Sequence, residues 1–199
     1  MEVNIYQTMK NKYSIIYADP PWSYNSRMAL GRGASRSSAE DYYSTMTLEQ
    51  ICAMQGVIND IAAKDCILFL WVTMPKLFDA QCVISDWGFT YKTVAFVWVK
   101  RNKIYNEKRA ELHGGIDDFM GQGRWTRQNA ELCLLCTKGS PKRISAKVRQ
   151  IVYSPIREHS RKPDEVRDRI VDLCGDVPRI ELFARQQVDG WDCWGDEVY

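Results

Sequence analysis

The stretch Tyr13-Ser14-Ile15-Ile16-Tyr17-Ala18-Asp19-Pro20-Pro21-Trp22 decides how this chain folds, because it joins a buried strand to a rigid polar end. The apolar, β-branched run at 13–18 predicts the strand. The two prolines fix φ and remove two backbone donors, so the turn should be stiff and leave carbonyl oxygens open to a ligand. A carboxylate at the carboxyl end of such a strand lies where open α/β sheets bind ligands. We therefore expect a functional site at Asp19.

An ordinary turn with Trp22 packed on the core would use the same four residues. We favour a ligand site because the Asp-Pro-Pro-Trp motif rarely arises by chance and because it directly follows a predicted strand. In that case the indole of Trp22 offers a flat apolar face on which a base can stack, a contact worth about 1–3 kcal/mol.

The composition is that of a globular protein, with 199 residues, 45% of them hydrophobic and 26% charged. This length predicts a single domain over residues 1–199, and the composition excludes a disordered or fibrous class. Apolar runs all fall short of the roughly 20 residues that span a bilayer, and residues 1–4 lack the features of a signal peptide. The sequence therefore predicts a cytoplasmic protein without a membrane segment.

Seven cysteines are scattered through apolar runs, and only Cys133 and Cys136 have the spacing of metal ligands. They lie in a run typical of a strand, where residues three apart point to opposite faces. We expect buried, reduced thiols and no metal site.

Strand and helix patterns alternate along the chain. The periodicity predicts helices after Thr47, which begins a capping box, after Pro75 and from Pro163, with glycine caps at Gly88 and Gly175. It predicts strands at 13–18, 66–72, 90–99, 131–137, near 151 and at 179–183. This order favours an α/β fold with a mostly parallel central sheet. Two long polar loops, 23–38 and 100–129, are expected to carry function.

Basic residues are unevenly distributed, although the net charge is only +2. Solvated loops often have this composition, but three basic stretches beside a base-stacking motif indicate a phosphate-binding surface. The stretch 26–40 contains Arg27, Arg32 and Arg36, the stretch 100–127 contains Lys100, Arg101, Lys103, Lys108, Arg109, Arg124 and Arg127, and the stretch 138–149 contains Lys138, Lys142, Arg143, Lys147 and Arg149.

The glycine-rich turn of common nucleotide-binding folds, GxGxxG, does not follow the first strand or occur elsewhere. The remaining candidate for a cofactor strand is C-terminal, in the run from Ile180 to Arg185, followed by Trp191 to Glu197. The strand order is then permuted, with the strand before Asp19 first and the cofactor strand last.

Five short motifs occur in a fixed order along the chain. They are Ala18-Asp19-Pro20-Pro21-Trp22, Leu68-Phe69-Leu70-Trp71-Val72, Trp98-Val99-Lys100, Lys162-Pro163-Asp164-Glu165 and Ile180-Glu181-Leu182-Phe183-Ala184-Arg185. Through these motifs the chain resembles, over about residues 15–197, the adenine-N6 methyltransferase family named for the 70-kDa subunit of the eukaryotic messenger-RNA adenosine methyltransferase. The resemblance implies a Rossmann-like fold, permuted as in the beta group of amino-methyltransferases, and the cofactor S-adenosylmethionine.

The resemblance also implies roles for individual residues. The family's adenine side corresponds here to Pro20, Pro21, Trp22 and Glu131. Relatives often carry amides where this chain has Asp196 and Glu197, and they vary at Gln186 and Gln187. The cofactor side corresponds to Asp19, Lys162, Arg185, Gln186, Gln187, Asp196 and Glu197.

The roles of three residues can also be considered from the sequence itself. The Lys162 ammonium could bind the methionine carboxylate of the cofactor; alternatively, it is a solvated cation that precedes a helix. Arg185 suits polar groups of the cofactor, or forms a structural ion pair with Glu181 or Asp164. His159 could line the substrate entrance, or is simply exposed.

Transfer to adenine needs the lone pair of the amino nitrogen aimed at the methyl carbon. That lone pair is delocalised into the ring, and hydrogen bonds from its N–H groups to the Asp19 carboxylate and the Pro20 carbonyl would favour a pyramidal, nucleophilic nitrogen. The methylated nitrogen is strongly acidic, so no strong general base is required.

Three functions are compatible with these residues. The leading hypothesis is N6 methylation of adenine in DNA, by a monomer or homodimer, with Asp19, Pro20, Pro21 and Trp22 as the catalytic residues. RNA is the alternative substrate. The third possibility is a catalytically silent nucleic-acid-binding module, which the intact Asp19 and Trp22 disfavour. Arg27, Arg32, Arg36, Lys103, Glu131 and His159 are the further residues expected to bind the nucleic acid.

Overall fold

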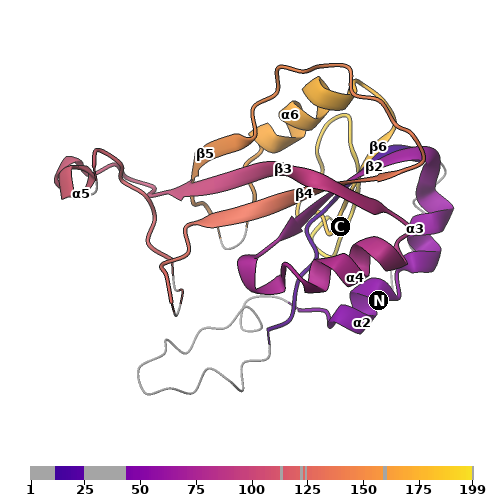
Figure 1. The fold of residues 1–199 in the computed structure, drawn as a ribbon, viewed down its shortest axis with the longest axis horizontal. Helices are drawn as coiled ribbons and strands as arrows, with labels where there is room; N and C mark the ends of the chain where they lie inside the picture. Colours follow the sequence, from indigo (N-terminus) through magenta and orange to yellow (C-terminus); the bar gives the residue numbers. More distant parts are fainter. Residues whose placement is uncertain are drawn as a thin grey trace.

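The computed structural model describes residues 12–24, 44–112, 114–121, 123, 125–158 and 161–198. Within them one sheet carries helices on both faces (Figure 1). Its strands are β1 (Tyr13–Ala18), β2 (Ala62–Val72), β3 (Thr90–Arg101), β4 (Ala130–Lys138), β5 (Ile151–Pro155), β6 (Arg179–Leu182) and β7 (Asp192–Trp194). The helices are α2 (Leu48–Cys52), α3 (Gln55–Ile61), α4 (Asp79–Asp86), α5 (Glu107–Leu112) and α6 (Glu165–Cys174), with a short 3-10 helix at Met74–Lys76.

The strand order is β5-β3-β4-β2-β1-β6-β7. β1 pairs in parallel with β2 on one side and with β6 on the other, so the first strand of the chain lies beside the penultimate one. This confirms the permuted, Rossmann-like order. β4 pairs antiparallel with both β2 and β3, while the other pairings among the described strands are parallel. The excursion between β3 and β4 places no crossover helix on the sheet, so β4 returns beside β3 in the opposite direction.

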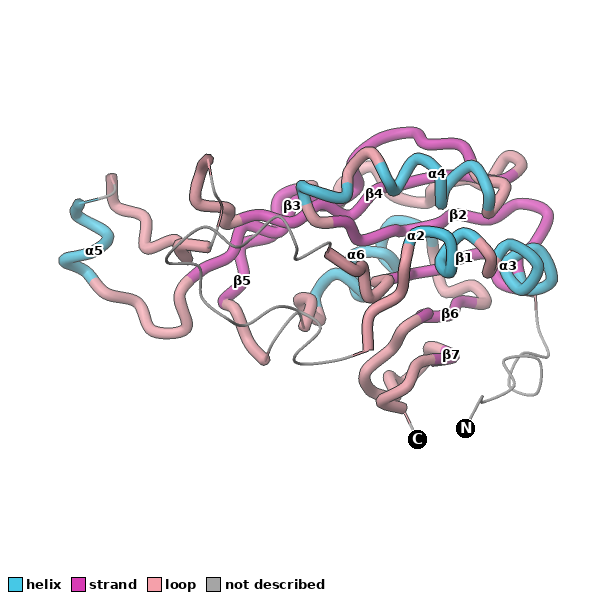
Figure 2. Tube along the Cα trace, turned by 90° about the horizontal axis from the view of Figure 1, so that it is seen from below, coloured by secondary structure: helices cyan, strands magenta, loops and turns pink. Residues whose placement is uncertain are grey.

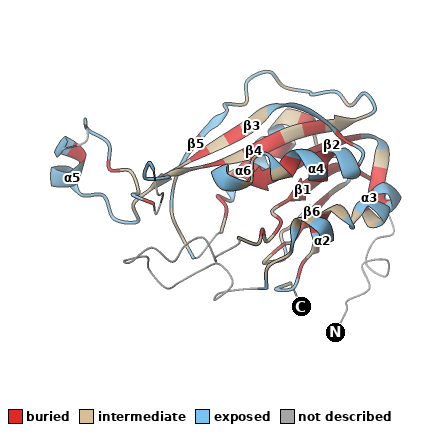
Figure 3. Cartoon of the chain, turned by 60° about the horizontal axis from the view of Figure 1, so that its bottom comes forward, coloured by how far each residue is buried: buried red, intermediate tan, exposed pale blue. Residues whose placement is uncertain are grey.

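The helices form two layers that bury separate cores. α2, α3 and α4 cover one face with Ile51, Ile58 and Val83, and α6 covers the other with Val166 and Ile170. Figure 1 shows the sheet between these layers, with α6 above it and α2 and α4 below it. Figure 2 views the helices α2, α3 and α4 from below, and Figure 3 shows that the central strands are the most buried part. Successive side chains of a strand point to opposite faces of the sheet, so they belong to opposite cores.

Cys133 and Cys136 are fully buried in opposite cores, as their spacing predicted. The cysteines are unbridged. Among the described residues there is no cluster of histidine, cysteine and carboxylate side chains that could hold a metal ion, and no helix is both long and apolar enough to cross a membrane.

The predicted helices are present, but their boundaries differ from those expected. Thr47 and Gln50 form the expected capping box. The single helix expected after it is instead two, because α2 ends at Cys52 and α3 begins at Gln55. Pro75 lies in the 3-10 helix, and α4 starts only at Asp79. Gly88 (φ 76°) and Gly175 (φ 93°) end their helices as predicted, since glycine alone adopts positive φ without strain.

The excursion from β3 to β4 is an arm that projects away from the sheet and carries α5 (Figure 1). Asp117, only 3% exposed, organises the described part of the arm. Its carboxylate accepts two hydrogen bonds from Arg109, at 2.7 and 2.8 Å, one from the Asn102 side chain and one from the Asn106 backbone. A polar stretch without periodicity is therefore ordered around a buried carboxylate rather than an apolar core.

Candidate active site

Among the described residues, three cavities share Asp19, which follows the end of β1. Their volumes are about 320, 410 and 160 Å³, respectively. Asp19 stands between β2 on one side and β6 on the other, where the direction of chain progression across the sheet reverses. Open α/β sheets bind their ligands at this switch point, outside the carboxyl ends of the strands.

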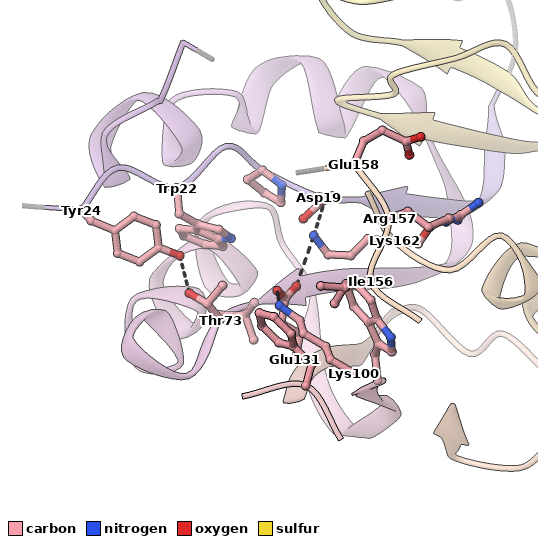
Figure 4. Close-up of a pocket in the computed structure, with 14 residues that line it drawn as sticks. Asp19, Trp22, Tyr24, Thr73, Lys100, Glu131, Ile156, Arg157, Glu158 and Lys162 are labelled. Carbon is pink, nitrogen blue, oxygen red and sulfur yellow. Dashed lines mark hydrogen bonds and ion pairs between the residues drawn. The ribbon is translucent and has the colours of Figure 1, made fainter. Parts of the chain in front are cut away.

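Asp19 belongs to a row of alternating charges (Figure 4). The Lys162 ammonium lies 2.6 Å from Asp19 Oδ2 and 3.3 Å from Glu131 Oε2. The other Glu131 oxygen accepts a hydrogen bond from Lys100. Lys162 precedes α6, Glu131 is on β4 and Lys100 is on β3, so four separate segments contribute one charge each.

Burial and pairing set the pKa values in this row. Burial raises the pKa of Asp19, and Lys162 opposes the rise only in part. Burial also disfavours ionised Glu131, but Lys162 and Lys100 together hold its pKa below the ordinary value. Burial alone would lower the pKa of Lys162, yet the carboxylates of Asp19 and Glu131 raise it, so the ammonium stays charged. The row therefore contains two cations and one firmly ionised carboxylate, with Asp19 the easier of the two acids to protonate.

The first cavity is largely aromatic and apolar. Tyr24 hydrogen-bonds Thr73 at its rim, and Lys100 lies over the Trp98 ring. A flat apolar space with charged groups at one end suits a planar heterocycle with a polar edge. The walls are formed by Pro20, Trp22, Tyr24, Val72, Thr73, Trp98, Phe119 and Ile156, and the charged lining residues are Asp19, Lys100, Glu131, Arg157, Glu158 and Lys162.

The Pro20 and Pro21 carbonyls after β1 accept hydrogen bonds from the protein backbone, which the sequence did not predict. The Pro20 carbonyl accepts a hydrogen bond from the Trp22 amide at 2.8 Å, and the Pro21 carbonyl accepts one from Met46, also at 2.8 Å. Each carbonyl oxygen has two lone pairs, so each retains one for a ligand. The expectation that both carbonyls would be wholly open was therefore wrong in part.

Trp22 combines the two roles that the sequence left as alternatives. It is 4% exposed, packs in the core beneath α2 and donates its indole N–H to the Trp71 carbonyl at 3.2 Å. It nevertheless lines the first cavity. The residue anchors the turn, and only a small part of its ring remains accessible for stacking.

The second cavity lies where β1 meets β6. Phe183, directly after β6, has φ 61°, an uncommon value for a bulky side chain that turns the chain sharply at the strand end. A Cβ at Gly195 would lie 2.2 Å from the Ala184 carbonyl oxygen, so only glycine allows the two segments to approach this closely. The lining includes Pro20, Pro21, Met46, Phe183, Arg185, Trp194, Asp196 and Glu197.

The residues of the second cavity fit S-adenosylmethionine, the cofactor implied for this family. A volume of about 410 Å³ is within the range of cofactor sites, and the carboxylates of Asp196 and Glu197 are acceptors suited to ribose hydroxyls. Arg185 Nε lies 3.7 Å from Glu197, so Arg185 shares in an ion pair at this wall.

The structure brings together most, but not all, of the residues singled out from the sequence. Lys162 is 8% exposed, so it is not a solvated cation. Glu181 and Asp164, the alternative partners considered for Arg185, instead pair with Arg167. Gln186 lines the third cavity, whereas Gln187 and Lys103 are exposed and line none of these three. Arg27, Arg32, Arg36 and His159 lie outside the described residues.

Several cavity residues escaped the sequence analysis. Tyr24, Thr73, Phe119 and Ile156 follow or precede strands, and such positions have no periodicity that could identify them. Trp98 and Lys100 were part of a shared sequence word but had no assigned role. The alternation of β3, which buries Trp98 at one end of the strand, was the available signal.

Several known proteins are similar in sequence to this chain over most of its length. Residues 13–197 match the MT-A70 family model. The chain is 34% identical to the type II methyltransferase M.MunI from Mycoplasma sp., over 96% of this chain and 80% of that protein. It is 28% identical to the putative N(6)-adenosine-methyltransferase MT-A70-like of Medicago truncatula, over 98% of this chain but 28% of that protein.

A third relative is the N(6)-adenosine-methyltransferase catalytic subunit METTL3 of Homo sapiens, 26% identical over 87% of this chain and 26% of that protein. The chain thus spans about a quarter of the two N(6)-adenosine-methyltransferases and four-fifths of M.MunI. The family match covers β1 to the segment after β7, which includes every described residue assigned to the three cavities. The chain belongs to the MT-A70 family of methyltransferases.

Proposed function

We propose that this protein transfers a methyl group from S-adenosylmethionine to N6 of adenine in DNA. One observation carries the proposal: the Asp19 carboxylate stands at the junction of a cofactor-sized cavity and an aromatic cavity. A group at that junction contacts both the amino nitrogen of a base and the bound methyl donor. The bound cofactor supplies the electrophilic methyl group, and the residues of this chain orient the base.

The row of charges prepares Asp19 for this task. The ion pair with Lys162 uses Oδ2 and fixes the direction of the carboxylate. Asp19 Oδ1 can accept an N–H of the amino group, while the second lone pair of the Pro20 carbonyl accepts the other. Held groups of this kind stabilise the charge redistribution of the transition state without reorganising, which is why preorganised hydrogen bonds have large effects on rate.

A double helix would have to release its adenine before this site could act. The amino nitrogen of a paired adenine is engaged with thymine inside the duplex, so the base has to leave the helix to enter the first cavity, whose volume is about 320 Å³. Enzymes that modify bases solve the problem by extruding the nucleotide, at a cost of a few kcal/mol that is smallest where pairing is already broken.

DNA is favoured over RNA by the comparison with relatives. The type II methyltransferase, a DNA-modifying class, is similar over 80% of its own length, whereas the two N(6)-adenosine-methyltransferases are similar over about a quarter. RNA remains the second candidate because those relatives act on adenosine. A silent binding module is disfavoured because Asp19, Lys162 and Glu131 form a complete row of charges.

Oligonucleotides of one sequence, prepared as matched duplex DNA, mismatched duplex DNA, single-stranded DNA and RNA, test the proposal with labelled S-adenosylmethionine. Methylation should occur on DNA, and a mismatch at the target adenine should not weaken binding. Mass spectrometry of the digested product should identify N6-methyladenine. Methylation confined to RNA would contradict the DNA assignment, and labelled product at another atom would contradict the chemistry.

The basic arm should contribute to DNA affinity through Lys103 and Lys108, which are exposed. We expect the variant with both lysines changed to Gln to bind DNA more weakly and to flatten the dependence of log K on log salt by up to about two units, since each lost phosphate contact removes about one. Fluorescence anisotropy at several salt concentrations measures this slope.

Arg109 is not suitable for that experiment, although the sequence grouped it with these lysines. Its guanidinium is bound to Asp117 and to the Ile104 carbonyl, so its replacement should disorder the arm. The sequence also grouped Lys142 and Lys147 with the phosphate-binding surface, but they follow the end of β4 opposite Glu131 and line none of the three cavities described above. They therefore provide a matched control. Equal slopes for the arm variant and the parent would mean that the arm does not contact phosphates.

A further inference from the structure

A buried ion pair joins α6 to the cofactor strand beside the third cavity. Arg167 on α6 is 9% exposed and Glu181 on β6 is 7% exposed. Arg167 Nε lies 2.6 Å from Glu181 Oε2, and Nη2 lies 2.8 Å from Oε1, so the pair is bidentate. Nη1 donates to Asp164 at 2.9 Å, and the guanidinium also faces the Tyr17 ring at 5.9 Å. These contacts fix both side chains completely.

Fold stability gives a poor explanation for such a pair. Burying two charges costs desolvation that their attraction barely offsets, and well-packed apolar residues of similar size usually stabilise a protein as much or more. The methyltransfer chemistry assigned to Asp19 does not use Arg167 or Glu181 either. The role of the Arg167–Glu181 pair therefore depends on the third cavity, which both residues line.

The third cavity has a volume of about 160 Å³ and paired charges on its walls. Cations and anions face it in equal numbers: Arg161, Lys162, Arg167 and Arg185, and Asp19, Glu158, Glu181 and Glu197. Its walls are tied together across the chain, because Arg161 donates to the Gln186 side chain at 3.1 Å and Arg167 bridges Asp164 and Glu181. A small space with both signs of charge suits a zwitterion better than a simple anion or cation.

The third cavity adjoins the second. Asp19, Phe183, Arg185 and Glu197 line both, so one extended ligand can occupy the two together. The sulfonium cofactor has this form, with an adenosine part and an amino-acid part that carries an ammonium and a carboxylate. The larger cavity takes the first part, and the charged one takes the second.

We propose that Arg167 and Glu181 are positioning residues that hold the third cavity in shape for the zwitterionic amino-acid end of the cofactor. The inference rests on the proposed use of S-adenosylmethionine. Arg167 holds the side chains of Asp164 and Glu181 in place, so the walls of the third cavity need not rearrange when the ligand binds. Because the pair acts on one end of the cofactor, its removal should distinguish ligands that possess this end from ligands that lack it.

Two ligands make that distinction by isothermal titration calorimetry. S-adenosylhomocysteine has the amino-acid end, and 5′-methylthioadenosine lacks it. The double variant Arg167→Met/Glu181→Met removes the charges without leaving one buried and unpaired. We expect it to bind S-adenosylhomocysteine about 10- to 100-fold more weakly, the loss typical of hydrogen bonds to charged groups, and to bind 5′-methylthioadenosine within about threefold of the parent.

Arg169→Met is the matched control, because Arg169 lies on the same helix but lines none of the three cavities. It pairs with the half-buried Glu165 and donates to the Arg149 and Ile151 carbonyls. This variant should bind both ligands like the parent. Arg167→Lys, which keeps the charge but not the bidentate geometry, should be intermediate for S-adenosylhomocysteine. Melting temperatures of all variants show whether each is folded, and Arg167→Lys keeps the test valid if the double variant is not.

An equal loss of affinity for both ligands, or no loss for either, would overturn the proposal, because either result reduces the pair to a structural one. Failure of the proposed function would look different. In that case the parent protein itself would bind neither S-adenosylhomocysteine nor S-adenosylmethionine.

Discussion

Asp19→Asn should reduce the rate of methyl transfer by a factor of about 10²–10³, or roughly 3–4 kcal/mol, with little change in fold. The amide keeps the shape of the carboxylate but has no negative charge to accept the amino N–H, and it leaves Lys162 with one carboxylate partner instead of two. Single-turnover transfer of a labelled methyl group to DNA measures the effect. Glu165→Gln, which alters an exposed pair on α6, is the control and should leave the rate unchanged. A rate within tenfold of the parent would contradict the role of Asp19.

The pH profile gives an independent check on Asp19. Only the ionised carboxylate accepts the N–H, and burial raises the pKa of this group above its ordinary value. The rate should therefore fall as the pH is lowered, with a midpoint above the value of about 3.9 expected for an exposed aspartate. The acid limb should be absent in Asp19→Asn, whose remaining activity does not depend on this ionisation.

Lys162→Met should destabilise the protein by about 3–5 kcal/mol and nearly abolish transfer. The substitution leaves the partly buried carboxylate of Asp19 and the buried carboxylate of Glu131 without their shared cation. Lys162 lowers the pKa of both acids, so its loss raises the pKa of Asp19 further. The acid limb of the remaining activity should then move to higher pH. Chemical denaturation and the pH profile together measure these two effects.

Two further variants separate the charge of Lys162 from its packing. Adding Glu131→Gln to Lys162→Met removes a carboxylate that has lost one of its two cations and should recover part of the lost stability. Lys138→Met, at the opposite end of β4, pairs only with Asn59 among the described contacts and should have a small effect. If Lys162→Met retained both the stability and the acid limb of the parent, the row of charges would have no role in holding Asp19.

Local sequence was sufficient for the position of Asp19 and for most strands. Ile15, Ile16 and Tyr17 are fully buried, as expected for a short apolar, β-branched run that forms a central strand, and Asp19 follows at the carboxyl end of that strand. The positive φ at Gly88 and Gly175 was likewise predictable, since it depends on the residue itself. The direction of β4 was not, because an apolar strand buried on both faces has the same pattern whichever way it runs.

The sequence by itself determined that a strand ends in a carboxylate, that a further strand lies near the C-terminus, and that strands and helices alternate in an α/β fold. Only the tertiary structure decided which charges meet. Lys162 reaches Asp19 across 143 positions, and Arg167 binds Glu181 rather than leaving it to Arg185. Periodicity records whether a residue is buried, which depends on its near neighbours along the chain. The choice of partner for a buried charge depends on which strands and helices the fold places side by side, and the spacing of residues contains no record of that.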